Sequence, residues 1–205
     1  MKRDIILVFL LLGGISLHAE TVDQHISIVN MSAVEPSIVE IIRVHAEKEL
    51  YVPVIATNVQ SSCMGDLTMT GKMMALELKR PSDACLIVLA NPKLADSEHA
   101  VILTNIQVAV INVSALKSGS SLDFEWRLRR LTMRGVAILF GLGSVPDPHC
   151  VMHSYRTLEE LDKMGTNFSP PLGDQFRNAA AARGLSVRPL FTPRPNLKKP
   201  AVKTE

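Results

Sequence analysis

Short runs of β-branched and aliphatic residues alternate with segments of helical spacing over most of the chain. The strand-like runs cover residues 26–29, 52–59, 85–89, 101–103 and 108–113, and helical spacing recurs over 38–46 and 69–78. Strands interleaved with helices bury their apolar side chains by forming a sheet on which the helices pack. The alternation therefore predicts an α/β fold, with the last two runs as neighbouring strands.

A longer pattern in the second half predicts the main helix. Residues 122–142 keep helical spacing, with Ser120 or Ser121 available as the N-cap and Gly143 near the expected end. Two shorter helices are expected after it, over residues 158–164 and 174–183.

The N-terminus has the organisation of a secretory signal peptide. Lys2 and Arg3 give a basic start, residues 5–12 form an unbroken apolar run, and Ala19 is a small residue suited to cleavage. The run is shorter than the ~20 apolar residues that a spanning helix needs. We expect residues 1–19 to be removed and the protein to be exported, periplasmic or secreted, with no stable membrane span. An uncleaved anchor is the alternative.

The C-terminal tail, residues 189–205, combines four prolines with three lysines and shows no apolar period. We expect this segment to be disordered, because it has too little apolar surface to bury. One folded domain is then expected over residues 20–188. A structural envelope component whose basic tail touches an anionic surface is one function compatible with this organisation.

The charge balance argues against a nucleic-acid partner. Lysine and arginine number 22 against 20 aspartates and glutamates, and aromatic residues make up only 4% of the chain. Neither a strong positive field nor a set of aromatic stacking platforms is therefore expected.

Three cysteines, Cys63, Cys85 and Cys150, allow one disulfide and leave one thiol over. Export makes a bridge chemically possible. Buried or unpaired thiols are the simpler expectation, since free cysteine packs as a small hydrophobe. The sequence leaves the pairing open.

Residues 134–144 read Arg-Gly-Val-Ala-Ile-Leu-Phe-Gly-Leu-Gly-Ser, and a loop with Cys150 and Met152 follows. This stretch resembles the archaemetzincins, metzincin-type zinc peptidases in which a helix ending in H-E-x-x-H-x-x-G-x-x-H runs into a cysteine-bearing loop and a methionine turn. Gly141 stands at the family's glycine and Met152 at its turn methionine. The resemblance implies a metzincin-like mixed sheet with helices, including a long former active-site helix.

The departures from the family pattern concern its catalytic residues. Arg134, Ile138 and Ser144 stand where the resemblance puts the zinc-binding histidines, and Gly135 stands at the place of the catalytic glutamate. Arginine stays protonated and isoleucine has no lone pair, so neither can coordinate a cation. We therefore expect a dismantled zinc site, with no catalytic residue and no cofactor.

Two of these positions leave alternatives open. Arg134 is expected to be solvated or paired with a carboxylate, or else to contact an anion or a peptide carboxylate in the former cleft. Gly135 marks either a close approach of the helix backbone or neutral drift.

The resemblance also implies a second, structural zinc site, and its cysteines are largely absent here. Cys150 remains, whereas Val145 and Ser169 stand at places where further cysteines would be expected. One cysteine cannot complete a zinc tetrahedron.

His149, Cys150 and His153 are the remaining weak candidates for a metal site. They lie on a proline-flanked turn, where a spacing of four residues does not make two histidines converge. A zinc-dependent metallopeptidase that uses His149 and His153 as atypical ligands is nevertheless the alternative function.

The main functional expectation is an exported pseudo-peptidase that binds without cutting. Its partner would be an extended peptide or an envelope protein, added as a strand at the edge formed by residues 101–103. This expectation requires that the protein's own chain leaves that edge uncovered.

Overall fold

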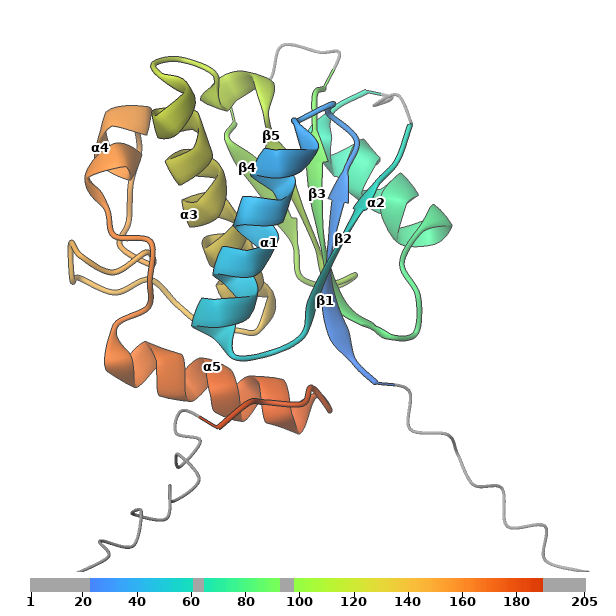
Figure 1. Ribbon diagram of the computed structural model, residues 1–205, viewed down its shortest axis with the longest axis vertical. Coiled ribbons are helices and arrows are strands. Elements are labelled where there is room, and N and C mark those ends of the chain that lie inside the picture. The colour runs from blue at the N-terminus through green and yellow to red at the C-terminus, as the bar shows by residue number, and fades with distance from the viewer. Residues whose placement is uncertain (1–22, 61–64, 93–97, 190–205) are drawn as a thin grey trace, which may run out of the picture.

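The computed structural model describes residues 23–60, 65–92 and 98–189, and Figure 1 shows how they are arranged. The elements are β1 (His25–Asn30), α1 (Pro36–Leu50), β2 (Val54–Asn58), α2 (Leu67–Glu77), β3 (Asp83–Ala90), β4 (Ala100–Leu103), β5 (Val108–Asn112), a 3₁₀ turn η1 (Ser114–Leu116), α3 (Ser121–Leu139), α4 (Leu158–Lys163) and α5 (Pro170–Ala182). The expected signal peptide, the tail after Pro189 and Cys63 lie outside the described residues. Within those residues, every helix is too short or too polar to cross a membrane.

The described strands form one mixed sheet in the order β2-β1-β3-β5-β4. β2, β1, β3 and β5 run parallel, whereas β4 pairs antiparallel with β5 at one edge. Each predicted strand is present, and the runs 101–103 and 108–113 are neighbours as expected. The predicted α/β fold class is confirmed.

Helices cover both faces of this sheet. α1 and α3 pack together on one face, and α2 lies on the other (Figure 1). Successive side chains of β3 therefore point to opposite faces of the sheet, because side chains alternate along a strand. Cys85, Ile87 and Leu89 belong to the core under α1 and α3, and Leu86 and Val88 to the core under α2. Burial on both faces explains why β3 reads as a continuous apolar run.

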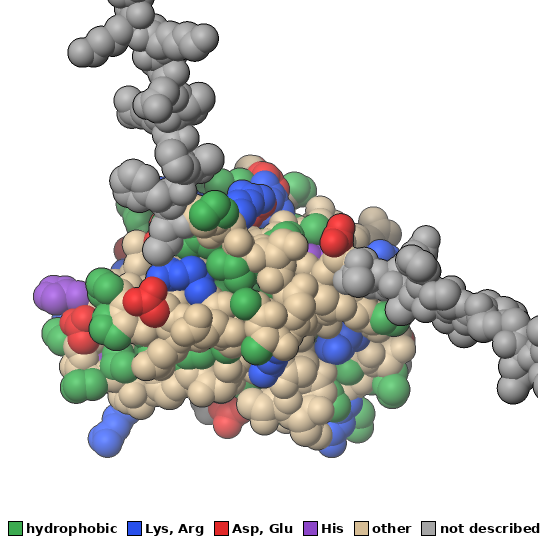
Figure 2. Space-filling view, turned by 90° about the horizontal axis from the view of Figure 1, so that it is seen from below, with side chains coloured by type: hydrophobic (Ala, Val, Ile, Leu, Met, Phe, Trp, Pro, Cys, Tyr) green, Lys and Arg blue, Asp and Glu red, His purple; other side chains and the backbone are tan. Residues whose placement is uncertain are grey.

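The end of the molecule closed by α5 has a mixed surface. Acidic, basic and apolar side chains are interspersed on the face seen from below (Figure 2). This distribution agrees with the near balance of 22 basic and 20 acidic residues.

α3 has well-defined ends. The Ser120 hydroxyl accepts the Asp123 N–H at 3.1 Å, and the Asp123 carboxylate accepts the Ser120 N–H at 3.0 Å, which completes a capping box. At the other end Gly141 has a φ of +85°, and the Leu142 N–H donates to the Ala137 carbonyl at 2.9 Å. The helix therefore ends at Leu139 rather than at the predicted residue 142, because Gly141 supplies the left-handed turn of a Schellman motif.

The start predicted for α5 is also wrong. The helix begins at Pro170 instead of residue 174. Pro170 and Pro171 occupy its first turn, where the missing N–H groups would have no partner within the helix.

Cys85 and Cys150 are buried free thiols. Burial raises the pKa of the Cys85 thiol to about 12, so this group stays protonated at neutral pH. The expectation of buried, unpaired thiols is confirmed for these two residues.

Gly135 lets α3 approach the sheet closely. A Cβ atom at this position would lie 3.1 Å from the Cβ of Ala109 in β5 and 3.4 Å from Cδ1 of Ile87 in β3. Of the two roles expected for Gly135, close backbone approach is the one that this packing favours.

We expect Gly135→Val to lower the free energy of unfolding by about 1–3 kcal/mol, because the branched side chain would overpack the space against Ala109 and Ile87. Urea denaturation measures the change. Gly143→Val is the matched control, because no heavy atom lies within 4 Å of the added Cβ there; its expected change is below about 0.5 kcal/mol. Equal losses at the two positions would contradict the close packing.

Candidate functional site

Three arginines on one side of α3 connect the helix to other segments of the chain. Arg127, Arg130 and Arg134 are spaced by three and four residues, which places them on one helical face. We call these three residues the arginine face. Arg127 and Arg130 are buried and Arg134 is half-buried. All three donate hydrogen bonds to main-chain carbonyls outside the helix.

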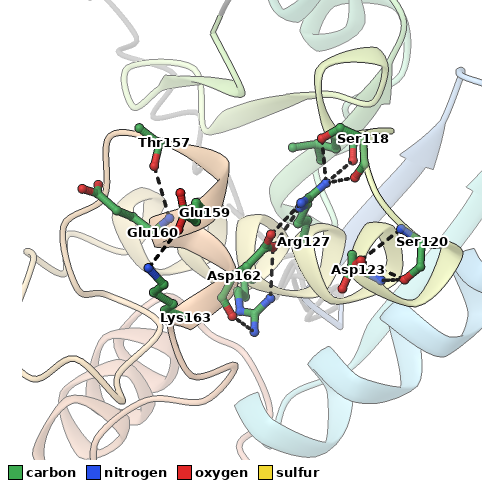
Figure 3. Close-up of polar contacts among 11 residues, drawn as sticks. Ser118, Ser120, Asp123, Arg127, Thr157, Glu159, Glu160, Asp162 and Lys163 are labelled. Carbon is green, nitrogen blue, oxygen red and sulfur yellow. Dashed lines mark hydrogen bonds and ion pairs between the residues drawn. The ribbon is translucent and has the colours of Figure 1, made fainter.

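Arg127 forms a two-pronged ion pair with Asp162 of α4 (Figure 3). Its Nε lies 2.8 Å from Oδ1 and its Nη2 lies 2.5 Å from Oδ2. Its Nη1 donates to the carbonyls of Leu116, at 3.0 Å, and Ser118. The hydrogen bond to Asp162 raises the pKa of Arg127, which opposes the effect of burial.

Arg130 continues the connection to the end of α4. Its Nε donates to the Met164 carbonyl at 2.9 Å, and its Nη2 donates to the Asp162 carbonyl at 3.0 Å. Burial lowers the pKa of Arg130, while the charge of Asp162 acts in the opposite direction. The guanidinium groups of Arg127 and Arg130 thus connect α3 to α4 and its C-cap, beside the burial of Leu161 in the core that α3 shares.

We expect Asp162→Asn to lower the free energy of unfolding by about 2–3 kcal/mol, because it leaves the buried Arg127 cation without its anion. Thermal and chemical denaturation measure this loss. The control is Glu159→Gln, which removes an ion pair with Lys163 on the same helix; both side chains are exposed, at 81% and 72%. Such a pair contributes less than about 0.5 kcal/mol. A similarly small loss for Asp162→Asn would contradict this account.

Arg134 joins α3 to the segment that contains the predicted methionine turn. Its Nη1 donates to the Val151 carbonyl at 2.7 Å and to the His153 carbonyl at 2.6 Å. Its Cζ lies 5.0 Å from the centre of the Tyr155 ring. Burial lowers the pKa of Arg134, and no carboxylate among the described residues pairs with it. Its hydrogen-bond partners among the described residues are therefore main-chain carbonyls rather than an acid, while the half-buried side chain keeps part of its surface in solvent.

The turn around Met152 is buried. Met152 and Cys150 are each 1% exposed. The Cys150 sulfur accepts the N–H groups of Met152 and Ser169, each at 3.4 Å, and the Val145 N–H donates to the Met152 carbonyl at 3.1 Å. The resemblance assigned Val145, Cys150 and Ser169 to a structural zinc site, and all three lie around this turn with Cys150 as the single cysteine among them.

The residues at the expected catalytic ligand places do not fit a zinc ion. Arg134 presents a cation, Ile138 packs half-buried against the core, and Ser144 is exposed in the loop after α3. Only the serine carries an oxygen with lone pairs, and zinc needs three nitrogen, sulfur or carboxylate ligands.

The weak candidates in the turn are not brought together either. His149 is exposed, Cys150 is buried, and the Nδ1 of His153 lies 3.3 Å from the Val145 carbonyl oxygen. In the part of the chain that the structure describes, no three His, Cys, Asp or Glu side chains form a metal-binding group.

Tyr155 lies between the arginine face and the sheet edge. Its ring stacks on that of His99, with the ring centres 5.8 Å apart and the planes 13° from parallel. Arg134 contacts the Tyr155 ring as well. Because His99 directly precedes β4, this column of three side chains links Arg134 to the start of the edge strand.

None of the described residues pairs with the outer side of β4. The Asn112 N–H donates to the His99 carbonyl at 2.9 Å, which makes these two residues a hydrogen-bonded pair. Hydrogen-bonded pairs alternate along an antiparallel ladder, so Val101 is the next residue to bond inward. The backbone N–H and C=O groups of Ala100 and Ile102 consequently face away from the sheet.

A hollow of about 420 Å³ opens beside Tyr155, between the turn and α4. Arg156 and Lys163 line it, together with one carboxylate, Glu160. The Glu160 carboxylate accepts the Arg156 N–H at 2.6 Å. The hollow therefore has an excess of positive charge.

Sequence reasoning missed several of these residues. Arg127, Arg130 and Asp162 form the main ion-pair network, and Tyr155 and His99 form the column beside the edge strand. The spacing of the arginines over residues 127–134 was a usable signal, since it places three cations on one helical face. No comparable pattern marked Asp162 or Tyr155.

Comparison with known proteins identifies the architecture. No protein-family model matches the chain, and no curated protein is significantly similar to it. Among solved structures, an archaemetzincin from Methanopyrus kandleri matches with a TM-score of 0.62 and 18% identity, over 80% of this chain and 99% of that one. A zinc-dependent peptidase from Methanocorpusculum labreanum matches with 0.58 and 18%, over 74% and 99%.

A third solved structure agrees. An archaemetzincin from Archaeoglobus fulgidus matches with a TM-score of 0.57 and 17% identity, over 74% of this chain and 99% of that one. Since each of these structures is covered almost completely, the likeness concerns the whole architecture rather than one motif. The described chain has the archaemetzincin fold.

Proposed function

We propose that this protein is an exported, archaemetzincin-like pseudo-peptidase that binds an extended peptide or an envelope protein without cleaving it. The observation that carries the proposal is the place of Arg134. Where the resemblance puts the first zinc-binding histidine, its guanidinium group donates to the carbonyls of Val151 and His153.

The chemistry at this place argues against peptide hydrolysis. A guanidinium group repels a metal cation and has no lone pair with which to bind one. Gly135, at the place of the catalytic glutamate, provides no general base, and its position faces Ala109 and Ile87 in the core. A base of this kind typically contributes about 10²–10⁴ in rate.

Binding is supported by the free edge of β4. Ala100 and Ile102 direct unpaired backbone groups outward, and an extended peptide can satisfy them by adding a strand. The described residues leave this edge uncovered, as the binding hypothesis requires. Export is proposed from the N-terminal apolar run at residues 5–12.

The first test separates a binding protein from an enzyme. Exported, untagged protein is expected to contain no stoichiometric zinc by mass spectrometry and to leave a mixed peptide library uncut. One zinc per chain that is lost in His149→Ala or His153→Ala, together with peptide cleavage, would overturn the proposal. That result would establish the metallopeptidase with atypical ligands.

The second test concerns the edge strand. Ala100→Pro removes an outward N–H at the first residue of β4, where proline is tolerated. We expect it to weaken binding of extended peptides roughly 3- to 10-fold, the effect of about one hydrogen bond. Fluorescence anisotropy with a labelled library of random, capped decapeptides measures the change.

The matched control lies on the opposite edge. The Val59 N–H donates to the Asn30 carbonyl at 3.0 Å, so alternation along β2 turns the Ala56 N–H outward. Ala56 and Ala100 are both half-buried against the same core. Ala56→Pro is expected to leave peptide binding unchanged, and equal effects of the two prolines would contradict binding at β4.

A further inference from the structure

Arg127 and Arg134 donate hydrogen bonds in the same way through one nitrogen. In each residue Nη1 binds two main-chain carbonyls, those of Leu116 and Ser118 for Arg127 and those of Val151 and His153 for Arg134. In Arg127 the remaining fork, Nε and Nη2, holds both oxygens of the Asp162 carboxylate. The two arginines lie seven residues apart on the same helical face.

The same fork of Arg134 has no protein partner among the described residues. Neither Nε nor Nη2 is fully shielded from solvent. A half-buried cation without an anion is unfavourable, and a guanidinium fork matches the two oxygens of a carboxylate. A carboxylate from outside the described chain would match this fork.

The position of the fork relates it to the edge strand. Arg134 contacts the Tyr155 ring, Tyr155 stacks on His99, and His99 precedes Ala100, the first residue of β4 with outward backbone groups. A peptide paired with β4 would therefore run past this column. Arg156 and Lys163 in the adjoining hollow add positive charge against the single carboxylate of Glu160.

We propose that Nε and Nη2 of Arg134 bind a carboxylate of the peptide that pairs with β4, which makes the preferred partner an acidic peptide. The inference rests on the proposed binding function. The carboxylate comes from an Asp or Glu side chain or from a peptide C-terminus.

Three labelled pools of random decapeptides distinguish these sources. One pool has a central Glu and blocked ends, the second has Gln at that position and blocked ends, and the third has the central Gln with a free C-terminal carboxylate. We expect wild-type protein to bind the first or the third pool roughly 10-fold more tightly than the second, since a charge-assisted bond is lost with the carboxylate. The pool that is preferred identifies the source.

Variants assign the preference to Arg134. Arg134→Lys keeps a cation that can reach the two carbonyls but removes the planar fork, so the preference for a carboxylate is expected to fall at least about threefold. Lys48→Gln is the control, because it removes an exposed positive charge of α1 that lies neither on β4 nor in the lining of the hollow, and it should leave the preference intact. Circular dichroism checks that both variants are folded.

The outcomes are separable. If wild-type protein binds all three pools equally, the carboxylate site is refuted while the peptide-binding function stands. If folded wild-type protein binds none of them, the proposed function fails and the inference fails with it. Should Arg134→Lys not fold, the Arg134 Nε–H signal of wild-type protein in ¹⁵N NMR replaces it as the readout. The expected result is a shift of this signal on adding the preferred pool and no shift on adding the Gln pool. No shift with the preferred pool overturns the inference.

Discussion

Guanidinium groups of α3 hold the segment from Val151 to Met164 against the rest of the molecule. That segment contains only one short helix, so many of its carbonyl groups need hydrogen-bond donors from elsewhere. Arg130 supplies donors to Asp162 and Met164, and Arg134 supplies them to Val151 and His153. Because each guanidinium group carries five N–H donors in a rigid plane, one side chain can satisfy two carbonyls and still have donors left.

The same interaction sets the chemistry of the site. A positive charge stands at the place where the resemblance expects a metal ligand, and its hydrogen bonds connect the helix to the turn that follows. The chain thus has the archaemetzincin fold with a side chain at this place that donates hydrogen bonds to two carbonyls. The outward backbone groups of β4 take no part in these hydrogen bonds, so the proposed peptide binding does not require a catalytic centre.

The sequence predicts the helices and strands more completely than it predicts the contacts of the candidate site. Runs of β-branched and aliphatic residues predict β1, β3 and β5, and helical spacing predicts α3, because burial of apolar side chains fixes these elements locally. Gly141 and Met152 were found through their motif. The partners of Arg134 were not, since they lie 17 and 19 residues away on a loop whose position depends on the packing of the whole domain. Asp162 was not predicted either, for the same reason: its partner Arg127 lies 35 residues away in the sequence.

The central claim is that Arg134 occupies the place of a metal ligand and excludes a metal. Crystals of the protein grown with excess zinc, with diffraction data collected on both sides of the zinc absorption edge, test it most directly. The account predicts no anomalous peak beside the arginine face, with Arg134 bonded to Val151 and His153. A zinc peak next to α3, with the Arg134 side chain turned away from both carbonyls, would contradict it.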